Sequence, residues 1–531
     1  MKTPTRPVHL AALASIITAG LLFRISHAPW DVPVILDAVL YFWHAGDIAI
    51  LGGLPPSSEI SFLPANNGWP ILLAGVFALV DSTSHIDYMA AQRATGMILS
   101  VLTALPIYVI CRRFFPAGVS LIAPAIFVLE PRIAENSYLG LTEPLFILLT
   151  TSTLACFLHA DRRVVWAAFP LAALAAMVRG EGVILIVPYV ILYCTRFRRR
   201  SLYEAPALVL VFLLVLAPMM SYRIDVSGTD SMFMRVADGL GSLYGWVAQP
   251  AAPPAGMPAG PAPDPPDDPP GTGPPSLGSR AASAALASIP VIIFLAPYGL
   301  YRAARSGLPG ISLIMVAGFM AAGAAVAFLS SPGGSRYLFP IVPILCVFAA
   351  YTVQRLGGMV RRKEAATAAI AVLIAASSVP ILEGTRFDAD HAREALHVAG
   401  VVAGTAASVN HYHLESGYIP AAVMSGHEFP VLRSEVHTGG SLAGCARVEP
   451  SECPHIVIPS GDLLGFLAGD GSGLTHLVVD DRTERRPQFM MDIYGDESAY
   501  PYLAKVYDSR DDGLAYHAKI FEIDRGMLPA P

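Results

Sequence analysis

The chain has 531 residues, of which 54% are hydrophobic and only 14% are charged, and its mean hydropathy is +0.53. Soluble domains carry about 25% charged residues, so this composition excludes an ordinary soluble protein and predicts a multi-spanning α-helical membrane protein. The net charge of −6 at pH 7 and the absence of a basic stripe argue against nucleic-acid binding.

Apolar segments recur along most of the chain, and about 20 such residues are needed to cross a membrane. We expect about 11 transmembrane helices, the first of which is a retained span rather than a signal peptide. The segment 70–80 is too short to cross and is expected to lie on the outer surface. The expected spans lie near residues 8–25, 90–110, 117–133, 139–158, 163–178, 182–195, 203–222, 286–301, 310–330, 336–356 and 364–382.

Arginine clusters between these segments predict the orientation, because basic loops remain in the cytoplasm. If the N-terminus is cytoplasmic, all of the strong clusters between spans fall inside. The first outer loop at 26–89, the loop at 223–285 and the tail then lie outside. The sequence thus predicts a protein integral to the cytoplasmic (inner) membrane. The clusters are Arg112-Arg113, Arg162-Arg163, Arg196 to Arg200, Arg302 to Arg305, and Arg355 to Lys363.

Two regions differ from the apolar pattern. The loop 223–285 is rich in proline, so we expect an extended segment that is either a spacer or a tolerated insertion. After residue 382 the composition becomes that of a soluble chain. We therefore predict a transmembrane domain at 1–382 and a small extracytoplasmic α/β soluble domain at 383–531. Its expected elements are a helix at 391–404 and strands at 455–459, 475–481 and 515–523.

Cysteine and histidine residues in the tail offer two further expectations. Cys445 and Cys453 lie eight residues apart and would form a disulfide in an oxidising compartment. His411 and His413 could point to one face of a strand, but two ligands do not make a metal site, and surface histidines are the simpler interpretation. Four other cysteines lie in or beside spans, where we expect inert thiols: Cys111, Cys156, Cys194 and Cys346.

The first outer loop interleaves acidic and aromatic residues between Trp30 and Pro70. Asp37 lies in PVILDAVLYFWHAGDIAI, where Tyr41 would share its face of a helix. A carboxylate near aromatic rings at a membrane surface can have a raised pKa and accept a proton. Alternatively, Asp37 only caps a surface helix, and these residues alone favour neither interpretation.

Three other charged residues lie at expected outer ends of spans, where ionisable groups are functional candidates. Glu143, which precedes Pro144, is either a helix cap or a second acidic group of the same site. Arg179, next to Glu181, either forms a local ion pair or binds a lipid phosphate. Arg336 is the best phosphate-binding candidate, with interfacial snorkelling as the alternative.

Five stretches occur in an order that resembles the GT-C superfamily of membrane glycosyltransferases. The closest likeness is to the branch of dolichyl-phosphate-mannose protein mannosyltransferases and bacterial lipid A aminoarabinose transferases. The stretches are Asp37-Ala38 with Tyr41, Gly68-Trp69-Pro70-Ile71-Leu72-Leu73-Ala74, Ala91-Gln92-Arg93 with Tyr108 and Arg112-Arg113, Leu141-Thr142-Glu143-Pro144-Leu145-Phe146, and Arg336-Tyr337-Leu338 with Pro340 and Pro343.

The resemblance implies a cell-envelope glycosyltransferase of the hexosyl- or pentosyltransferase type. It would move a sugar, with inversion, from a polyprenyl-phosphate donor to a hydroxyl of a protein, lipid or glycan acceptor outside the membrane. Asp37 aligns with the catalytic base of the family. The resemblance further implies substrate-binding roles for Tyr41, Trp69, Glu143, Arg179, Arg336 and Tyr337. The first loop lacks a D-x-D motif, so a divalent cation is left open rather than required.

Other classes remain open at this point. A lipid-linked saccharide flippase or transporter would keep its charges near the midplane and often contain repeated halves. An O-antigen ligase or polymerase would carry catalytic arginine and histidine in a late outer loop, whereas the loop 223–285 contains arginines but no histidine. A structural role, with the tail as a binding module, is the third alternative.

Overall fold

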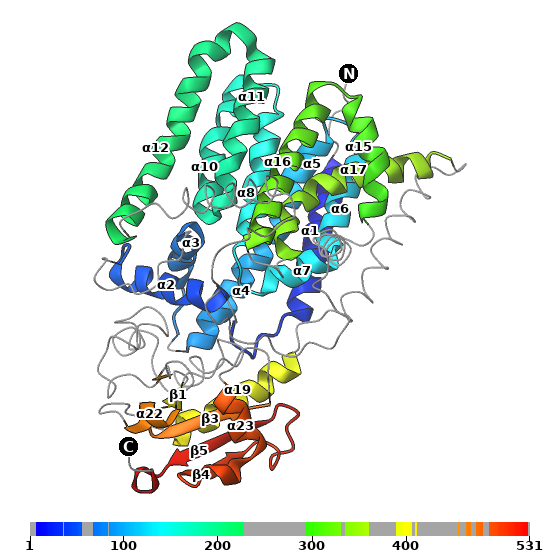
Figure 1. The fold of residues 1–531 in the computed structure, drawn as a ribbon. Coiled ribbons are helices and arrows are strands. Elements are labelled where there is room, and N and C mark those ends of the chain that lie inside the picture. Colours follow the sequence, from blue (N-terminus) through cyan, green and yellow to red (C-terminus); the bar gives the residue numbers. More distant parts are fainter. Residues whose placement is uncertain are drawn as a thin grey trace, which may run out of the picture.

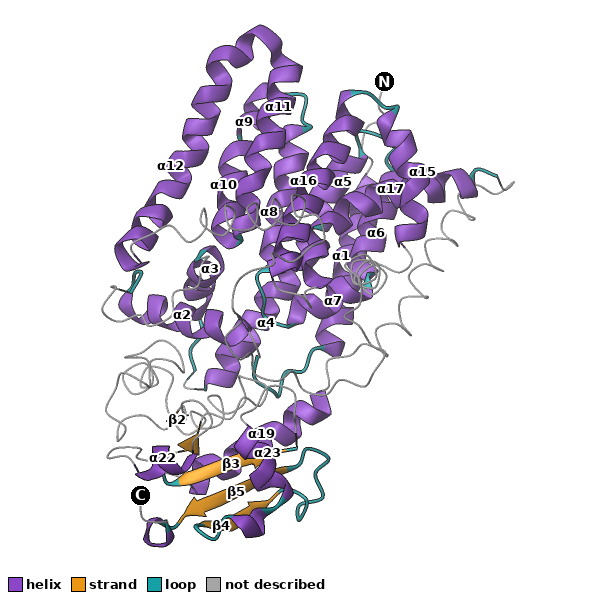
Figure 2. Cartoon of the chain, viewed as in Figure 1, coloured by secondary structure: helices purple, strands orange, loops and turns teal. Residues whose placement is uncertain are grey.

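A computed structural model of the chain shows a bundle of helices at one end and a small group of strands and helices at the other (Figures 1 and 2). The helical bundle contains the elements from Pro7 to Gly357, and the group with strands contains those from Ala389 onward. The structure describes residues 7–34, 37–55, 67–82, 84–227, 292–330, 335–359, 389–405, 409–410, 455–456, 463–468, 474–481 and 488–528.

The first half of the bundle consists of short helices that follow one another closely after a single long one. Proline begins or enters several of them, as its missing N–H is tolerated in the first helical turn. These elements are α1 (Pro7–His27), α2 (Asp37–Leu51), α3 (Gly68–Phe77), α4 (His85–Leu102), α5 (Ala104–Cys111), η2 (Val119–Leu121), α6 (Ile122–Leu129), α7 (Pro131–Tyr138) and α8 (Glu143–Phe157).

The second half contains the longest helix and the segment that completes the bundle. Short 3-10 turns precede α11, α12 and α17. The elements are α9 (Arg162–Trp166), α10 (Ala168–Val178), η3 (Gly180–Leu185), α11 (Ile186–Phe197), η4 (Arg198–Arg200), α12 (Ser201–Ser227), α15 (Ile292–Ala304), α16 (Leu308–Ser330), η5 (Ser335–Ile341) and α17 (Val342–Gly357).

Among the described residues, four stretches are long and apolar enough to cross a membrane: Pro7–His27, Ile86–Cys111, Gly180–Val226 and Arg336–Gly357. Shorter apolar helices lie between them. Each of the first ten spans expected from the sequence overlaps a helix, and the eleventh, at 364–382, lies outside the described residues. The short segment 70–80 corresponds largely to α3, which packs against α2, α4 and α10.

Helix α10 packs small residues inside the bundle, and large apolar residues of other helices remain exposed on its outside. Helix α10 buries Ala172, Ala173 and Ala176 completely, and it packs against α8 and α12. Small side chains let helices approach closely where lipid, rather than water, surrounds the bundle. On the outside, Leu214 of α12 is 61% exposed and Phe294 of α15 is 75% exposed, as expected for surfaces that contact lipid.

The described carboxyl-terminal residues contain a five-stranded sheet in the order β2-β1-β3-β5-β4. Strands β3 and β5 and strands β5 and β4 are antiparallel, and β1 pairs in parallel with β2 and β3. The strands are β1 (Val409–Asn410), β2 (His455–Ile456), β3 (His476–Asp480), β4 (Leu503–Asp508) and β5 (Ala518–Ile523), and the helices are α19 (Ala389–Thr405), α22 (Leu463–Ala468) and α23 (Gln488–Gly495).

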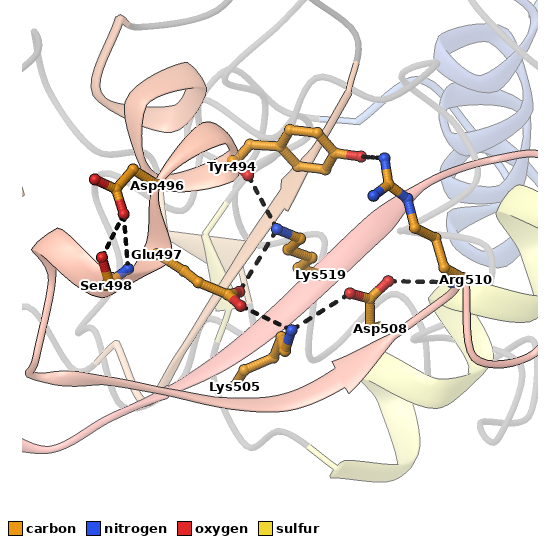
Figure 3. Close-up of polar contacts among 8 residues, drawn as sticks. All are labelled: Tyr494, Asp496, Glu497, Ser498, Lys505, Asp508, Arg510 and Lys519. Carbon is orange, nitrogen blue, oxygen red and sulfur yellow. Dashed lines mark hydrogen bonds and ion pairs between the residues drawn. The ribbon is translucent and has the colours of Figure 1, made fainter.

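The predicted helix at 391–404 and the three predicted strands coincide with α19, β2, β3 and β5, whereas the two-residue strand β1 and the longer strand β4 were missed. The side chains of β4 are mostly exposed, so LAKVYD lacks the alternation that marks a half-buried strand. The strand makes polar contacts instead (Figure 3). Lys505 Nζ of β4 lies 2.9 Å from Glu497 Oε1, and Lys519 Nζ of β5 lies 3.5 Å from Glu497 Oε2.

Helix α19 connects this region to the bundle. Arg393 contacts Asp31, which follows α1, through two hydrogen bonds of 2.5 and 3.1 Å. On the other side, Glu394 accepts a hydrogen bond of 2.6 Å from the backbone N–H of Tyr516. The hydrogen bond from Arg393 lowers the pKa of Asp31 below its ordinary value. The segment that leads from α1 to α2 is therefore held from the carboxyl-terminal side.

Candidate functional site

Asp37 is the first residue of α2, at the end of the bundle nearest the strands (Figure 1). Its side chain is 46% exposed, and the positive end of the helix dipole stabilises a carboxylate at this position. Helix α4 fixes the backbone around it. Arg93 donates to the carbonyl of Pro33 at 2.7 Å, and Gln92 donates to the carbonyl of Ala38 at 3.0 Å. The carboxylate is thus positioned by buried neighbours while it remains accessible.

Arg336 contacts this carboxylate, although 299 positions separate the two residues. Arg336 lies in η5, and its Nη2 donates to Asp37 Oδ2. Its Nε lies 3.7 Å from Glu143 Oε1. The arginine at the start of the last described bundle segment and the carboxylate of the first loop therefore meet in one ion pair.

Glu143 and Arg179 form the buried part of the site. Glu143 opens α8 and is 1% exposed, and its Oε1 accepts from Arg179 Nη1 at 2.7 Å. Arg179 also donates to the Thr142 hydroxyl at 3.3 Å and to Glu181 Oε1 at 2.9 Å. Within the described part of the chain, Glu143 Oε2 is buried without a hydrogen-bond partner. Glu143 thus follows the N-cap residue Thr142 and does not itself cap α8, and its carboxylate joins the ion-pair cluster.

The charge of Arg179 depends on these carboxylates. Burial by itself lowers the pKa of a guanidinium, because the charged form loses its hydration. Here Glu181 and Glu143 outweigh burial and raise the pKa of Arg179 above its ordinary value. Arg179 is therefore held as a cation although it is only 9% exposed.

Two tyrosines border the cluster. The guanidinium carbons of Arg179 and Arg336 lie 5.2 and 5.9 Å from the ring centroid of Tyr337, within the range of cation–π attraction. Burial and the nearby Asp37 carboxylate raise the pKa of Tyr41 above its ordinary value. Its phenol therefore stays protonated at neutral pH and can donate a hydrogen bond.

An apolar pocket opens beside Arg179, as the sharp turn between α10 and η3 allows. Gly182 packs directly on the preceding helix: a Cβ added there would lie 2.7 Å from the backbone nitrogen of Ala176. Glycine, which has no Cβ, permits this close approach of the two backbone segments. The pocket is lined by Phe146, Arg179, Glu181, Leu185, Met320, Gly323, Ala324, Tyr337 and Pro340. It combines hydrocarbon walls with the ion pair of Arg179 and Glu181.

Trp69 departs from the expectation that it contacts a sugar. Its side chain is fully buried, and its Nε1 donates to the carbonyl of Gly140 at 3.1 Å. It belongs to an apolar cluster with Phe42 and Phe77. The expectation is corrected on this point: α3 turns Trp69 into the protein, so it supports the site by packing and offers no ring face to a ligand.

Sequence reasoning missed the residues that position Asp37. Gln92 and Arg93 were noted only as part of a family-like stretch, and Thr142 was given no role. Gln92 Nε2 donates to the carbonyl of Gly140 at 2.7 Å as well as to that of Ala38, and Arg93 donates to the carbonyl of Tyr138 at 2.8 Å. The sequence did contain a signal, because Gln92 and Arg93 are two adjacent large polar residues inside an apolar helix. Such side chains need hydrogen-bond partners when they are buried.

The described residues were also compared with the requirements of a metal site. They contain no group of three histidine, cysteine or acidic side chains that could hold an ion. Asp37 and Glu143 are both engaged by arginines rather than turned toward one another. His411, His413, Cys445 and Cys453 lie outside the described residues, and Cys111, Cys156, Cys194 and Cys346 are free thiols.

Solved structures with the same arrangement of elements cover nearly the whole chain. ArnT from Cupriavidus metallidurans, bound to undecaprenyl phosphate, matches with a TM-score of 0.62 and 12% identity, covering 98% of this chain and 99% of that one. The chain has the GT-C glycosyltransferase fold. The archaeal oligosaccharyltransferase AglB from Archaeoglobus fulgidus, in complex with an inhibitory peptide and a dolichol-phosphate, matches with a TM-score of 0.55 and 12% identity, covering 97% and 75%.

The GT-C resemblance read from the sequence is therefore confirmed at the level of the fold, and the chain is an integral membrane protein. A second structure of the Archaeoglobus fulgidus enzyme, in complex with Zn and sulfate, matches with a TM-score of 0.56 and 12% identity over 97% of this chain and 74% of that one. No protein-family model matches the sequence, and no curated protein matches it.

Proposed function

We propose that this GT-C chain is an inverting hexosyl- or pentosyltransferase that moves a sugar from a polyprenyl-phosphate donor to an acceptor hydroxyl at the outer face of the membrane. One observation carries the proposal. Asp37, Arg336, Glu143 and Arg179 form a continuous chain of charged contacts beside an apolar pocket.

A polyprenyl phosphate has an anionic head and a hydrocarbon tail, and the pocket lining offers a cation and apolar side chains to them. The pocket has a volume of only about 20 Å³, so donor binding has to widen it. Leu185, Met320 and Pro340 supply apolar walls. Arg179 supplies a cation at the pocket, and a guanidinium matches phosphate oxygens in two hydrogen bonds. In support of the same ligand class, ArnT and AglB were solved with undecaprenyl phosphate and dolichol-phosphate, respectively.

In the proposed reaction, an acceptor oxygen attacks the anomeric carbon of the donor sugar from the face opposite the phosphate. The acceptor O–H proton passes to Asp37 while the new carbon–oxygen bond forms. The bond between the anomeric carbon and the phosphate oxygen breaks, and its electron pair remains on the lipid phosphate. Arg336 stabilises the charge that grows on this leaving group.

Arg336 has to exchange partners for this scheme to work. Asp37, Glu143 and Glu181 face Arg336 and Arg179, so the cluster has one more carboxylate than guanidinium groups. A donor phosphate that takes Arg336 away from Asp37 leaves this carboxylate without its opposite charge. Oδ2 of Asp37, which accepts from Arg336 before the donor binds, is then free to contact the acceptor hydroxyl. Donor binding thereby creates the base.

The orientation and the domains belong to the same proposal. The arginine clusters favour eleven spans in the cytoplasmic membrane, with Asp37 and residues 383–531 on the extracytoplasmic side. The sheet with α19, α22 and α23 supports an α/β domain over 383–531, and the helical bundle supports a transmembrane domain over 1–382. The acceptor is a hydroxyl of a protein, lipid or glycan.

The test is transfer of a radiolabelled sugar from a polyprenyl-phosphate donor in membrane vesicles that contain the chain. We expect label to leave the organic-soluble lipid fraction and to enter an acceptor fraction. Vesicles in which the donor merely crosses to the other leaflet, with its sugar still attached, would identify a flippase instead. Transfer of preassembled polysaccharide but of no single sugar would indicate the ligase class. Either result would refute the proposal.

A further inference from the structure

A second arginine cluster lines a pocket that contains no residue of the candidate site. The pocket has a volume of about 360 Å³. Ligand pockets in proteins start at about 300 Å³, so it can hold a small headgroup. It lies between the end of α5, the turn from α15 to α16, and α17. Its lining residues are Arg113, Phe114, Arg302, Arg305, Ser306, Pro309 and Tyr351.

The three arginines of this pocket have no acidic partner among the residues that the structure describes. Arg305 lies 4.4 Å from the ring centroid of Tyr301, which orients the guanidinium without neutralising it. Burial lowers the pKa of Arg113. Like charges around one hollow repel each other, so the arrangement favours an anion that comes from outside the chain.

The pocket is built on a fixed frame. The turn from α15 to α16 contains Gly307 at φ +73°, and a Cβ added to Gly310 would lie 1.9 Å from the carbonyl oxygen of Ala303. The Ser306 hydroxyl donates to the same carbonyl at 2.7 Å. These contacts hold the backbone of the turn from which Arg302 and Arg305 reach the pocket.

The surroundings of the pocket indicate where its ligand comes from. Tyr301 is 50% exposed, Ile311 is 45% exposed and Val109 is 43% exposed, and all three lie within a few residues of the lining. Apolar and aromatic side chains exposed at this level of a membrane protein contact lipid near the headgroups. An anion at the pocket would therefore lie beside acyl chains.

We propose that this pocket binds the phosphate-bearing headgroup of an anionic phospholipid in the leaflet opposite the candidate site. Arg302 and Arg305 bind the phosphate oxygens, and Arg113 adds a third cation from another helix. The α15–α16 turn lies at the end of the bundle away from the strands, whereas α2 lies toward them (Figure 1). The pocket is thus a second phosphate site, separate from the one that would hold the sugar donor.

The experiment uses the full chain in phosphatidylcholine nanodiscs. Dioctanoyl phosphatidylglycerol is the lipid probe, glycerol 3-phosphate is the soluble phosphate probe, and binding is measured by microscale thermophoresis. We expect Arg302→Gln/Arg305→Gln to bind the lipid probe at least about tenfold more weakly than the unchanged chain, because charge-assisted contacts are lost. The matched control Arg199→Gln/Arg200→Gln removes two exposed arginines of η4 and should change binding less than about twofold.

Two further variants separate binding from folding. Arg302→Lys/Arg305→Lys keeps the charge and should bind with intermediate affinity. Arg113→Gln, from another helix, should weaken binding on its own, and the thermal unfolding midpoint of each variant reports its folding. If the control and the test variant lost the same affinity for the lipid probe, or if neither lost any, the proposed lipid site would be refuted. Equally tight binding of glycerol 3-phosphate would overturn the assignment to a lipid.

Discussion

The two arginine clusters of this protein differ in how their charges are balanced. At the candidate site, Arg179 and Arg336 contact Glu143, Glu181 and Asp37. In the second pocket, Arg113, Arg302 and Arg305 have no acidic partner in the described part of the chain. A paired arginine must give up a carboxylate to bind an anion, so binding and the release of that carboxylate are coupled. An unpaired arginine binds an anion with no such coupling, which suits a site that only holds its ligand.

The largest expected effect comes from removing the carboxylate of Asp37, which the proposal releases from Arg336. Asp37→Asn keeps the shape of the side chain but cannot take a proton at neutral pH. We expect the turnover of sugar transfer to fall by about 10²- to 10⁴-fold, the usual contribution of a general base, while expression and folding are retained. Initial rates with labelled donor in vesicles measure this, and near-normal turnover would refute the assignment of Asp37.

The partner of this carboxylate gives the next largest effect. Arg336→Gln removes the cation proposed for the leaving phosphate, and a loss of about 10²- to 10³-fold in turnover is expected by analogy with other stabilising donors. Arg336→Lys, which keeps the charge but not the two-pronged geometry, should lose less. The assignment fails if both variants lose equally little, and the donor KM should be measured with turnover to show which of the two changes.

Glu143→Gln tests the buried half of the cluster. It leaves Arg179 with less opposite charge in a position that is 9% exposed, and we expect the free energy of unfolding to fall by about 3 kcal/mol, as when buried ion pairs lose a partner. Chemical denaturation in detergent measures this. Unchanged stability would show that Glu181 and Thr142 alone suffice to hold Arg179.

The smallest expected effect is on stability and concerns the exposed ion pair between Arg393 and Asp31. Arg393→Gln removes an ion pair whose side chains are 48% and 56% exposed, so the expected loss of stability is only about 0.5 kcal/mol. Because Arg393 lowers the pKa of Asp31, this contribution is present above the ordinary value of 3.8 and disappears as the pH falls below it. The difference in unfolding midpoint between the variant and the unchanged chain should therefore be smaller near pH 3 than at neutral pH.

The helices and the charged candidates could be predicted because they depend on local pattern. Apolar runs marked the bundle, and an acidic residue before a proline marked the start of α8. The ion pair between Asp37 and Arg336 could not be derived, since it depends on how segments 299 positions apart fold together. Trp69 was assigned wrongly because an aromatic residue in an outer loop suggests a stacking surface, whereas here it fills the space beneath α3. Strand β4 was missed because its exposed side chains carry no periodic signal.

The contact between Arg393 and Asp31 has a mechanical consequence. Asp31 precedes Asp37 by six residues. A segment of this length spans at most about 20 Å when it is fully extended. Arg93 of α4 holds this segment by donating hydrogen bonds to the carbonyls of Val32 and Pro33. An acceptor that bound the carboxyl-terminal sheet would therefore lie within a short length of chain from Asp37, the residue that we propose as the base.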